Sequence, residues 1–160
     1  NEAPAEEPAE EVAPIEVTAK ESEPFVPKKL LPIDRSIAKF ILLSLITFGI
    51  YAIVVMTKIS CEINIVATQY DGRKTRNYLW ILFLWGWLTL GIAFLVWHHQ
   101  LSNRIGNELH RRQIPYSFGA SDYWLWNVLG VWIAGILPWV YFYRLISAMN
   151  QLNADYNQKG

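Results

Sequence analysis

The first residues to consider for chemistry are three histidines, and their spacing does not build a site. His98 and His99 are adjacent, so a helix would point them about 100° apart. His110 would share a face with His99 but lie about 16 Å away along the helix axis. We therefore predict no metal site and expect these side chains to serve at a membrane interface or as helix caps.

Two further polar features have structural interpretations. Arg104 and Glu108 stand four residues apart, as in a surface ion pair on a helix. Asn127 is the one strongly polar side chain inside its apolar run, and we predict an intramembrane polar residue that bonds a neighbouring helix. The sequence has no paired carboxylates, no Gly-rich phosphate loop and no nucleophile beside a base. It therefore predicts no catalytic residue, no cofactor and no enzymatic activity.

Three apolar runs dominate the chain, at about residues 37–57, 78–98 and 123–143. Each has the length of one membrane span, roughly 20 residues. Eight Trp, eight Tyr and seven Phe gather inside and at the ends of these runs, as aromatic rings do at a membrane–water interface. We therefore predict an all-α membrane protein whose membrane-embedded domain covers residues 34–160.

Residues 1–33 differ sharply from that domain in composition. Residues 1–27 carry eight glutamates against one lysine, whereas residues 28–160 carry 13 basic residues against six acidic ones. Prolines recur through the segment, and it holds too little apolar surface to offset the entropy of ordering it. We predict a disordered Glu/Pro-rich linker, which tethers an N-terminal region to the membrane.

The three runs are related by internal repetition. A shift of 42 residues places Thr47 on Thr89 and Gly49 on Gly91, and a shift of 44 places Gly91 on Gly135. The predicted fold class is therefore three pseudo-repeats. Each is an apolar helical segment, kinked or broken at a glycine and followed by an amphipathic helix.

The amphipathic helices carry apolar stripes at helical spacing, which fit the membrane surface or a small bundle. The sequence does not choose between these arrangements. The stripes are Ile59, Ile63, Val66 and Tyr70, then Leu101, Ile105 and Leu109, then Leu145, Met149, Leu152 and Tyr156.

Two topologies fit the runs: three single spans, or three re-entrant hairpins. Pro138 suits the first turn of a new helix, so we predict structural turns at Gly49, Gly91, Gly135 and Pro138. Single spans would divide the basic residues seven to six between the two sides, which sets no orientation, whereas hairpins keep every connection cytoplasmic. Against hairpins, arms of about ten residues reach only about 15 Å. We slightly favour the hairpins.

Two clusters of basic residues flank the runs, one at Arg73, Lys74 and Arg76 and one at Arg111 and Arg112. We predict that they bind anionic lipid headgroups, at about 1 kcal/mol per basic residue. Nucleic acid is not a predicted partner, because the aromatic residues lie in the apolar runs and not among the basic clusters.

Four strings resemble a family of bacterial membrane proteins, domain of unknown function 4234. They are LITFGIYAIVVMTKIS, LTLGIAFLVWHHQLSNRIGNELHRRQI, YSFGASDYWLWNVLG and LISAMNQLNADYN. The resemblance covers most of residues 36–156 and implies a small multi-helix protein of the bacterial inner (cytoplasmic) membrane, multi-pass or re-entrant. It brings no activity, substrate or catalytic residue with it.

Two functions fit these features. The first is a membrane-embedded scaffold or anchor that holds the N-terminal region at the cytoplasmic face and assembles with itself or with another membrane protein. The alternative is a small oligomeric channel or transport component. Its pore would be lined by Asn127, Thr47, Thr89 and Ser44.

Overall fold

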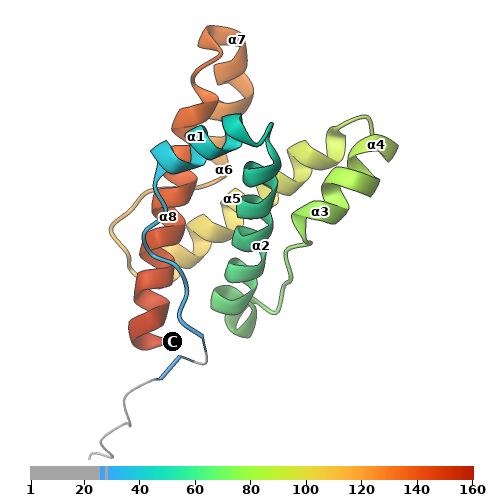
Figure 1. Ribbon diagram of the computed structural model, residues 1–160. Helices are drawn as coiled ribbons and strands as arrows, with labels where there is room; N and C mark the ends of the chain where they lie inside the picture. The colour runs from blue at the N-terminus through green and yellow to red at the C-terminus, as the bar shows by residue number, and fades with distance from the viewer. Residues whose placement is uncertain (1–25, 28) are drawn as a thin grey trace, which may run out of the picture.

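The computed structural model describes residues 26–27 and 29–160, and all regular structure in that part of the chain is helical (Figure 1). The all-α prediction is confirmed there, whereas most of the predicted linker lies outside the described residues. The elements are α1 (Ile37–Ile46), α2 (Ile50–Asp71), α3 (Tyr78–Trp80), η1 (Ile81–Trp85), α4 (Gly86–Leu88), α5 (Ile92–Arg111), α6 (Ala120–Asp122), η2 (Tyr123–Leu129), α7 (Gly130–Ala134) and α8 (Pro138–Lys159). The three segments α3, η1 and α4 form one continuous helix, and so do α6, η2 and α7.

The core lies where the long helices α2, α5 and α8 pack together. Ile63, Ile105 and Met149, one from each helix, have no exposed surface. Every other residue of the predicted stripes is buried as well, except Tyr70. Burying one such apolar side chain stabilises the fold by about 1.5–3 kcal/mol. Of the two arrangements that the sequence allowed, the stripes adopt the bundle.

Between α1 and α2 the chain reverses direction through a left-handed turn. Phe48 has a φ of 50° and Gly49 a φ of 89°. The hydroxyl of Thr47 donates to the carbonyl of Leu43 at 2.6 Å and accepts from the backbone N–H of Tyr51 at 2.9 Å. One side chain therefore bonds the helix that ends and the helix that begins.

The turn between α4 and α5 has the same geometry. Leu90 has a φ of 51° and Gly91 a φ of 89°. The hydroxyl of Thr89 donates to the carbonyl of Trp85 at 2.7 Å and accepts from the N–H of Ala93 at 2.9 Å. Both turns carry the string T-x-G, at residues 47–49 and 89–91. In each, the threonine bonds both helices, and the glycine takes a backbone conformation that side chains disfavour.

The turn between α7 and α8 is built differently. Ile133 stands where the other two turns have threonine, so it cannot make the two hydroxyl bonds. Gly135 has a positive φ of 49°, but α8 begins only at Pro138, which lies in the first turn of the new helix. The four predicted turn residues therefore all lie at helix breaks, in two different geometries.

The helices on either side of two turns lie in close contact. A Cβ atom added to Gly86 would overlap the ring of Phe94, and one added to Gly130 would overlap the side chain of Leu137. Glycine at these positions lets the side chains of Phe94 and Leu137 lie this close to the helix backbone. The segment Tyr78–Leu88 therefore packs against the start of α5, and α7 packs against the residue that precedes α8.

Apolar side chains face outward at the turns. Phe48 is 97% exposed, Leu90 95% and Trp132 87%. In Figure 1 the three turns lie in the upper part of the view and the C-terminus lies at the bottom. By length and composition, α2 is the one helix among the described residues that is suited to cross a membrane, while α1 and the segment Tyr78–Leu88 are apolar but shorter.

The last residues of the predicted linker belong to the fold, which corrects that boundary. Leu31 is buried, and its backbone N–H and carbonyl bond the side-chain amide of Asn157 at 2.9 and 2.8 Å. The Nδ2 atom of Asn153 donates to the carbonyl of Pro32 at 2.8 Å. These partners lie on α8, more than a hundred residues away along the chain, so composition alone could not reveal them.

The two T-x-G turns make a direct prediction about stability. Replacing Gly91 by alanine should lower the free energy of unfolding by roughly 1–2 kcal/mol, because a Cβ atom at positive φ is strained. Gly119→Ala is the matched control, since both glycines have open space around them but Gly119 has an extended backbone. Thermal unfolding in detergent micelles measures both, and equal losses would contradict the strain argument.

Candidate functional site

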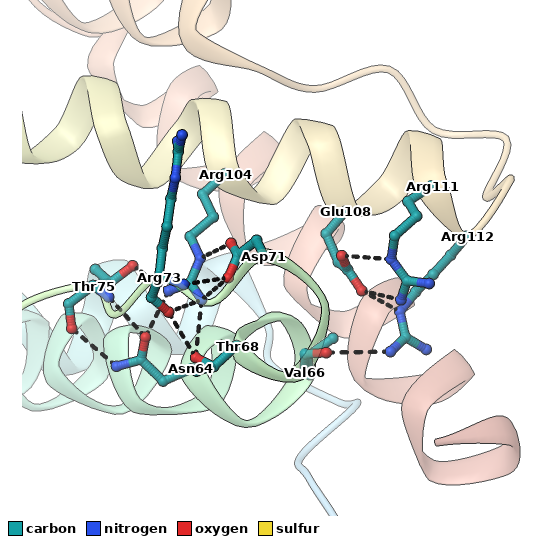
Figure 2. Close-up of polar contacts among 10 residues, drawn as sticks. All are labelled: Asn64, Val66, Thr68, Asp71, Arg73, Thr75, Arg104, Glu108, Arg111 and Arg112. Carbon is teal, nitrogen blue, oxygen red and sulfur yellow. Dashed lines mark hydrogen bonds and ion pairs between the residues drawn. The ribbon is translucent and has the colours of Figure 1, made fainter.

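A buried arginine on α5 organises the polar side of the bundle (Figure 2). The side chain of Arg104 is 9% exposed. Its Nε and Nη2 atoms donate to the two carboxylate oxygens of Asp71, at 2.7 and 3.0 Å. The other acceptors are the side chains of Asn64, Thr75 and Thr68, at 2.6, 2.8 and 3.0 Å, and the carbonyl of Arg73, at 2.6 Å. One guanidinium therefore joins α5 to α2 and to the loop that follows α2.

That loop, residues 72–77, is held by further bonds. Asn64 accepts from the backbone N–H of Thr75 at 2.8 Å and donates to its carbonyl at 2.9 Å. The indole N–H of Trp97 donates to the carbonyl of Arg76 at 2.8 Å. The loop backbone is thereby fixed at both ends, whereas its three basic side chains are exposed.

The predicted surface ion pair between Arg104 and Glu108 is wrong. Both residues are buried, and Glu108 pairs instead with Arg111 at 2.6 Å and Arg112 at 2.7 Å. Arg112 also pairs with Asp155 of α8, at 2.8 Å. The spacing of four residues permits the local pair, but partners on α2 and α8 and in the last turn of α5 bind these charges, and helical spacing does not report such partners.

The arginines hold the pKa of two carboxyl groups low. Burial acts to raise the pKa of Glu108, but the hydrogen bonds and charges of Arg111 and Arg112 outweigh it, so this pKa lies below its ordinary value of 4.5. Burial likewise opposes Lys159 and Arg112 at Asp155, whose pKa lies below 3.8. Both carboxylates are therefore ionised at neutral pH.

A groove of about 1010 Å³ lies beside this network, between α5, the loop 72–77 and the segment Tyr78–Leu88. Five basic residues and two acidic ones line its polar end: Arg73, Lys74, Arg76, Arg104, Arg111, Asp71 and Glu108. Apolar side chains line its other end: Ile81, Trp85, Ile92, Ala93 and Val96. The groove is therefore basic at one end and apolar at the other.

The structure brings four of the five predicted headgroup residues to this groove. Arg73, Lys74 and Arg76 are exposed, and the side chain of Arg111 is 39% exposed. Arg112 differs, because its side chain is 4% exposed and held by two carboxylates. We therefore leave Arg112 out of the residues that could bind a headgroup.

Two of the four residues predicted to line a pore use their hydroxyls within the protein, since Thr47 and Thr89 bond the backbones of their own turns. Ser44 is buried, and its hydroxyl has no hydrogen-bond partner among the described residues. Asn127 is half-buried on η2, where its amide bonds Tyr123 one helical turn earlier and on the same helix.

Two of the three histidines, His98 and His99, lie among aromatic side chains, whereas His110 is exposed. The ring of His98 stacks on that of Tyr123, with centroids 5.4 Å apart, and its Nδ1 atom lies 2.9 Å from the carbonyl of Phe94. The Nδ1 atom of His99 accepts a hydrogen bond from the indole of Trp124 at 3.0 Å. Within the described part of the chain, no group of three His, Cys, Asp or Glu side chains is arranged to hold a metal ion.

Two further ion pairs were missed by sequence reasoning. Arg35 donates to both carboxylate oxygens of the buried Glu62, and the Nε atom of Arg144 donates to Asp122 at 2.5 Å. A signal for the first pair was available, since Glu62 stands beside the apolar stripe residue Ile63 and a buried carboxylate needs a partner.

The described residues form an all-α protein. Buried arginines link its long helices, and apolar side chains are exposed at its turns. Residues 35–107 match the protein family described as "Domain of unknown function (DUF4234)", and over that segment the chain is similar to this family. The segment includes Arg35, Asp71, Arg104 and both T-x-G turns. No curated protein and no solved structure matches the chain.

The arginine network predicts a large effect of one substitution. Arg104→Gln should lower the free energy of unfolding by roughly 3 kcal/mol, because it removes the partner of Asp71 and leaves several polar groups unpaired. Arg73→Gln is the control, and its effect should stay within about 0.5 kcal/mol, since only its backbone carbonyl enters the network. Denaturant unfolding in micelles measures both variants, and comparable losses would contradict the assigned role.

The two depressed carboxyl pKa values predict the pH dependence of stability. Glu108 and Asp155 have lower pKa values in the folded protein than their values of 4.5 and 3.8 in the unfolded chain. The stability that they contribute is fully present above the unfolded pKa values, and it is lost as the pH falls through the folded ones. The melting temperature should therefore fall between pH 5 and pH 3, roughly across this range. The double variant Glu108→Gln and Asp155→Asn should melt lower at pH 7 and lose less on acidification. An equal loss in both proteins would rule out these groups as the cause.

Proposed function

We propose that the protein is a membrane-embedded scaffold or anchor, built from three repeats that each dip into the membrane as a re-entrant hairpin. The bundle of long helices then sits at the cytoplasmic face of the bacterial inner membrane. The observation that carries this proposal is the exposure of large apolar side chains at the turns, opposite a bundle held by ion pairs.

The distribution of polarity supports insertion of the turns into lipid. Phe48, Leu90 and Trp132 are almost fully exposed, and apolar side chains so exposed in water are costly when they form large patches. Most charged pairs gather instead along the second halves of α2, α5 and α8, and the exception, Arg144 with Asp122, joins the first half of α8 to the start of the third arm. A bilayer would cover the first group and leave the second at the headgroups or in water.

Two sets of equivalent positions support the repeat. The first two turns share their left-handed φ values and their threonine bonds, 42 residues apart. The core positions Ile63, Ile105 and Met149 have the same offsets of 42 and 44 as the glycines, and all three are fully buried. The third turn departs in its sequence and its geometry together.

The short arms favour hairpins over single spans. An arm of 10 residues such as α1 is about 15 Å long, half of the hydrocarbon core. Although α2 has the length and composition of a span, its second half carries the buried Glu62 and contributes to the bundle core. Moving that half into lipid would separate Glu62 from Arg35, so we assign only its first half to the membrane.

The anchoring role follows from where the N-terminal segment joins the domain. Leu31 and Pro32 bond the second half of α8, at the polar end of the bundle. A segment that precedes them would leave the domain on the cytoplasmic side. The acidic residues 1–25, or a partner bound to them, would then be held near the membrane surface.

Membrane insertion of the turns is tested by flotation of the full chain with liposomes. The triple variant Phe48→Asp, Leu90→Asp and Trp132→Asp should lose at least tenfold of its partition into lipid, since each aspartate inside a bilayer costs roughly 2–3 kcal/mol. Aspartate tolerates the left-handed conformation at Phe48 and Leu90, so the helices should persist by circular dichroism.

The matched control adds the same three aspartates at the polar end of the bundle, with Gln69→Asp, Gln113→Asp and Gln158→Asp, all at exposed positions. The control should float like the unaltered protein. Equal flotation of the two triple variants, or failure of the unaltered protein to float, would overturn the proposal.

A further inference from the structure

We propose that the groove between α5 and the loop 72–77 is a binding site for one anionic glycerophospholipid, which takes the phosphate headgroup at its basic end and an acyl chain along its apolar end. This inference rests on the proposed membrane insertion and deepens it. The observation behind it is that the basic loop 72–77 and the apolar side chains of α5 and of the segment Tyr78–Leu88 line the same continuous groove.

The headgroup end combines free positive charge with a rigid backbone. Arg104 and Asn64 hold the loop by its backbone, so its basic side chains are presented at fixed points. Among the described residues, no carboxylate forms an ion pair with Arg73, Lys74 or Arg76. Figure 2 shows the side chain of Arg73 extending toward α5, away from the bonds that its own carbonyl makes. Three uncompensated bases at this end would bind a phosphate diester.

The distance from the turn to the basic loop suits a hydrocarbon chain. The groove runs beside α5 from Ile92 near the turn to Arg111, and the twelve residues from Ile92 to Arg104, which bonds the loop, cover about 18 Å of helix. Its lining on α5 is apolar from Ile92 to Trp97, and His99, Gln100 and Asn103 line it between that part and Arg104. One leaflet of the hydrocarbon core is about 15 Å thick. An acyl chain that starts at the basic loop would therefore end near the turn, in the direction in which the hairpin enters the membrane.

An aromatic ring of the apolar end lies against the basic loop. The guanidinium of Arg76 lies over the ring of Trp85, 5.4 Å from its centroid, and Trp85 lines the groove. Tryptophan prefers the depth at which headgroups meet acyl chains. The basic loop therefore meets the apolar end of the groove at a tryptophan, the residue type expected where headgroups meet acyl chains.

Native mass spectrometry of the full chain in detergent micelles tests the site, with phosphatidylglycerol, phosphatidylcholine and glycerol phosphate as probes. One phosphatidylglycerol should be retained, at least tenfold more tightly than phosphatidylcholine. The triple variant Arg73→Gln, Lys74→Gln and Arg76→Gln should lose that preference, by about tenfold or more for three basic residues. Glycerol phosphate should not compete, because it lacks the chain that the apolar end would hold.

A charge-matched control removes three exposed bases outside the groove, with Lys29→Gln, Lys39→Gln and Lys58→Gln. It should keep the preference for phosphatidylglycerol. A blocking variant, Ala93→Trp, should weaken retention of lipid without removing any charge. Equal loss in the control would mean diffuse attraction, and competition by glycerol phosphate would mean a phosphate site. Either result overturns the lipid site.

The two proposals fail in different ways. If the protein floats with liposomes but retains no single lipid, the groove proposal fails and the anchor stands. If the protein does not float, membrane insertion itself fails, whatever binds to the groove in micelles.

Discussion

Packing of three apolar stripes against one another is the constraint on which the rest of this structure depends. Ile63, Ile105 and Met149 meet at the centre of the bundle with no exposed surface. Each stripe begins near the middle of its helix and continues toward the C-terminal end, so the bundle holds α2, α5 and α8 mainly by these parts. The most exposed apolar side chains, Phe48, Leu90 and Trp132, lie at the turns near the other ends of these helices.

Buried arginines add ion pairs to this bundle. Arg104 of α5 pairs with Asp71 of α2, and Arg112 at the end of α5 pairs with Asp155 of α8, so charge links the same helices that the stripes bring together. Arg35 ties the segment before α1 to Glu62 of α2. Guanidinium groups suit this role, because they donate several hydrogen bonds in a fixed geometry and remain ionised when buried. The polar network also fixes the loop that forms the basic end of the groove.

The all-helical fold and the buried faces of the long helices were accessible from the sequence, because apolar runs and helical spacing are local signals. The glycines marked the turns, and the spacing of the stripes identified the buried face of each long helix. The threonine of the T-x-G string was visible as a repeated residue, but its two backbone bonds became clear only in the folded turn. Ile133 replaces that threonine in the third turn, where the hydroxyl bonds are missing and the turn has a different geometry.

The charged site was harder to predict, because its partners are distant along the chain. Arg104 bonds residues 29 to 40 positions away, and helical spacing suggested the wrong partner, Glu108. The basic cluster at 73–76 was recognised as a cluster, whereas the groove that it joins depends on how α5 passes the loop. Arg112 belonged to a visible basic pair, and only the approach of Asp155 on α8 turns it inward.

The central claim is that every polar end of the three hairpins lies on one side of the membrane. Impermeant maleimide labelling in sealed, oriented vesicles tests it, with Gln69→Cys and Gln113→Cys placed singly in a Cys61→Ser chain, since Cys61 is exposed. Both cysteines should be labelled from the same side, the cytoplasmic one, if the runs form hairpins. Labelling of the two from opposite sides would contradict it, because an apolar run would then cross the membrane between them.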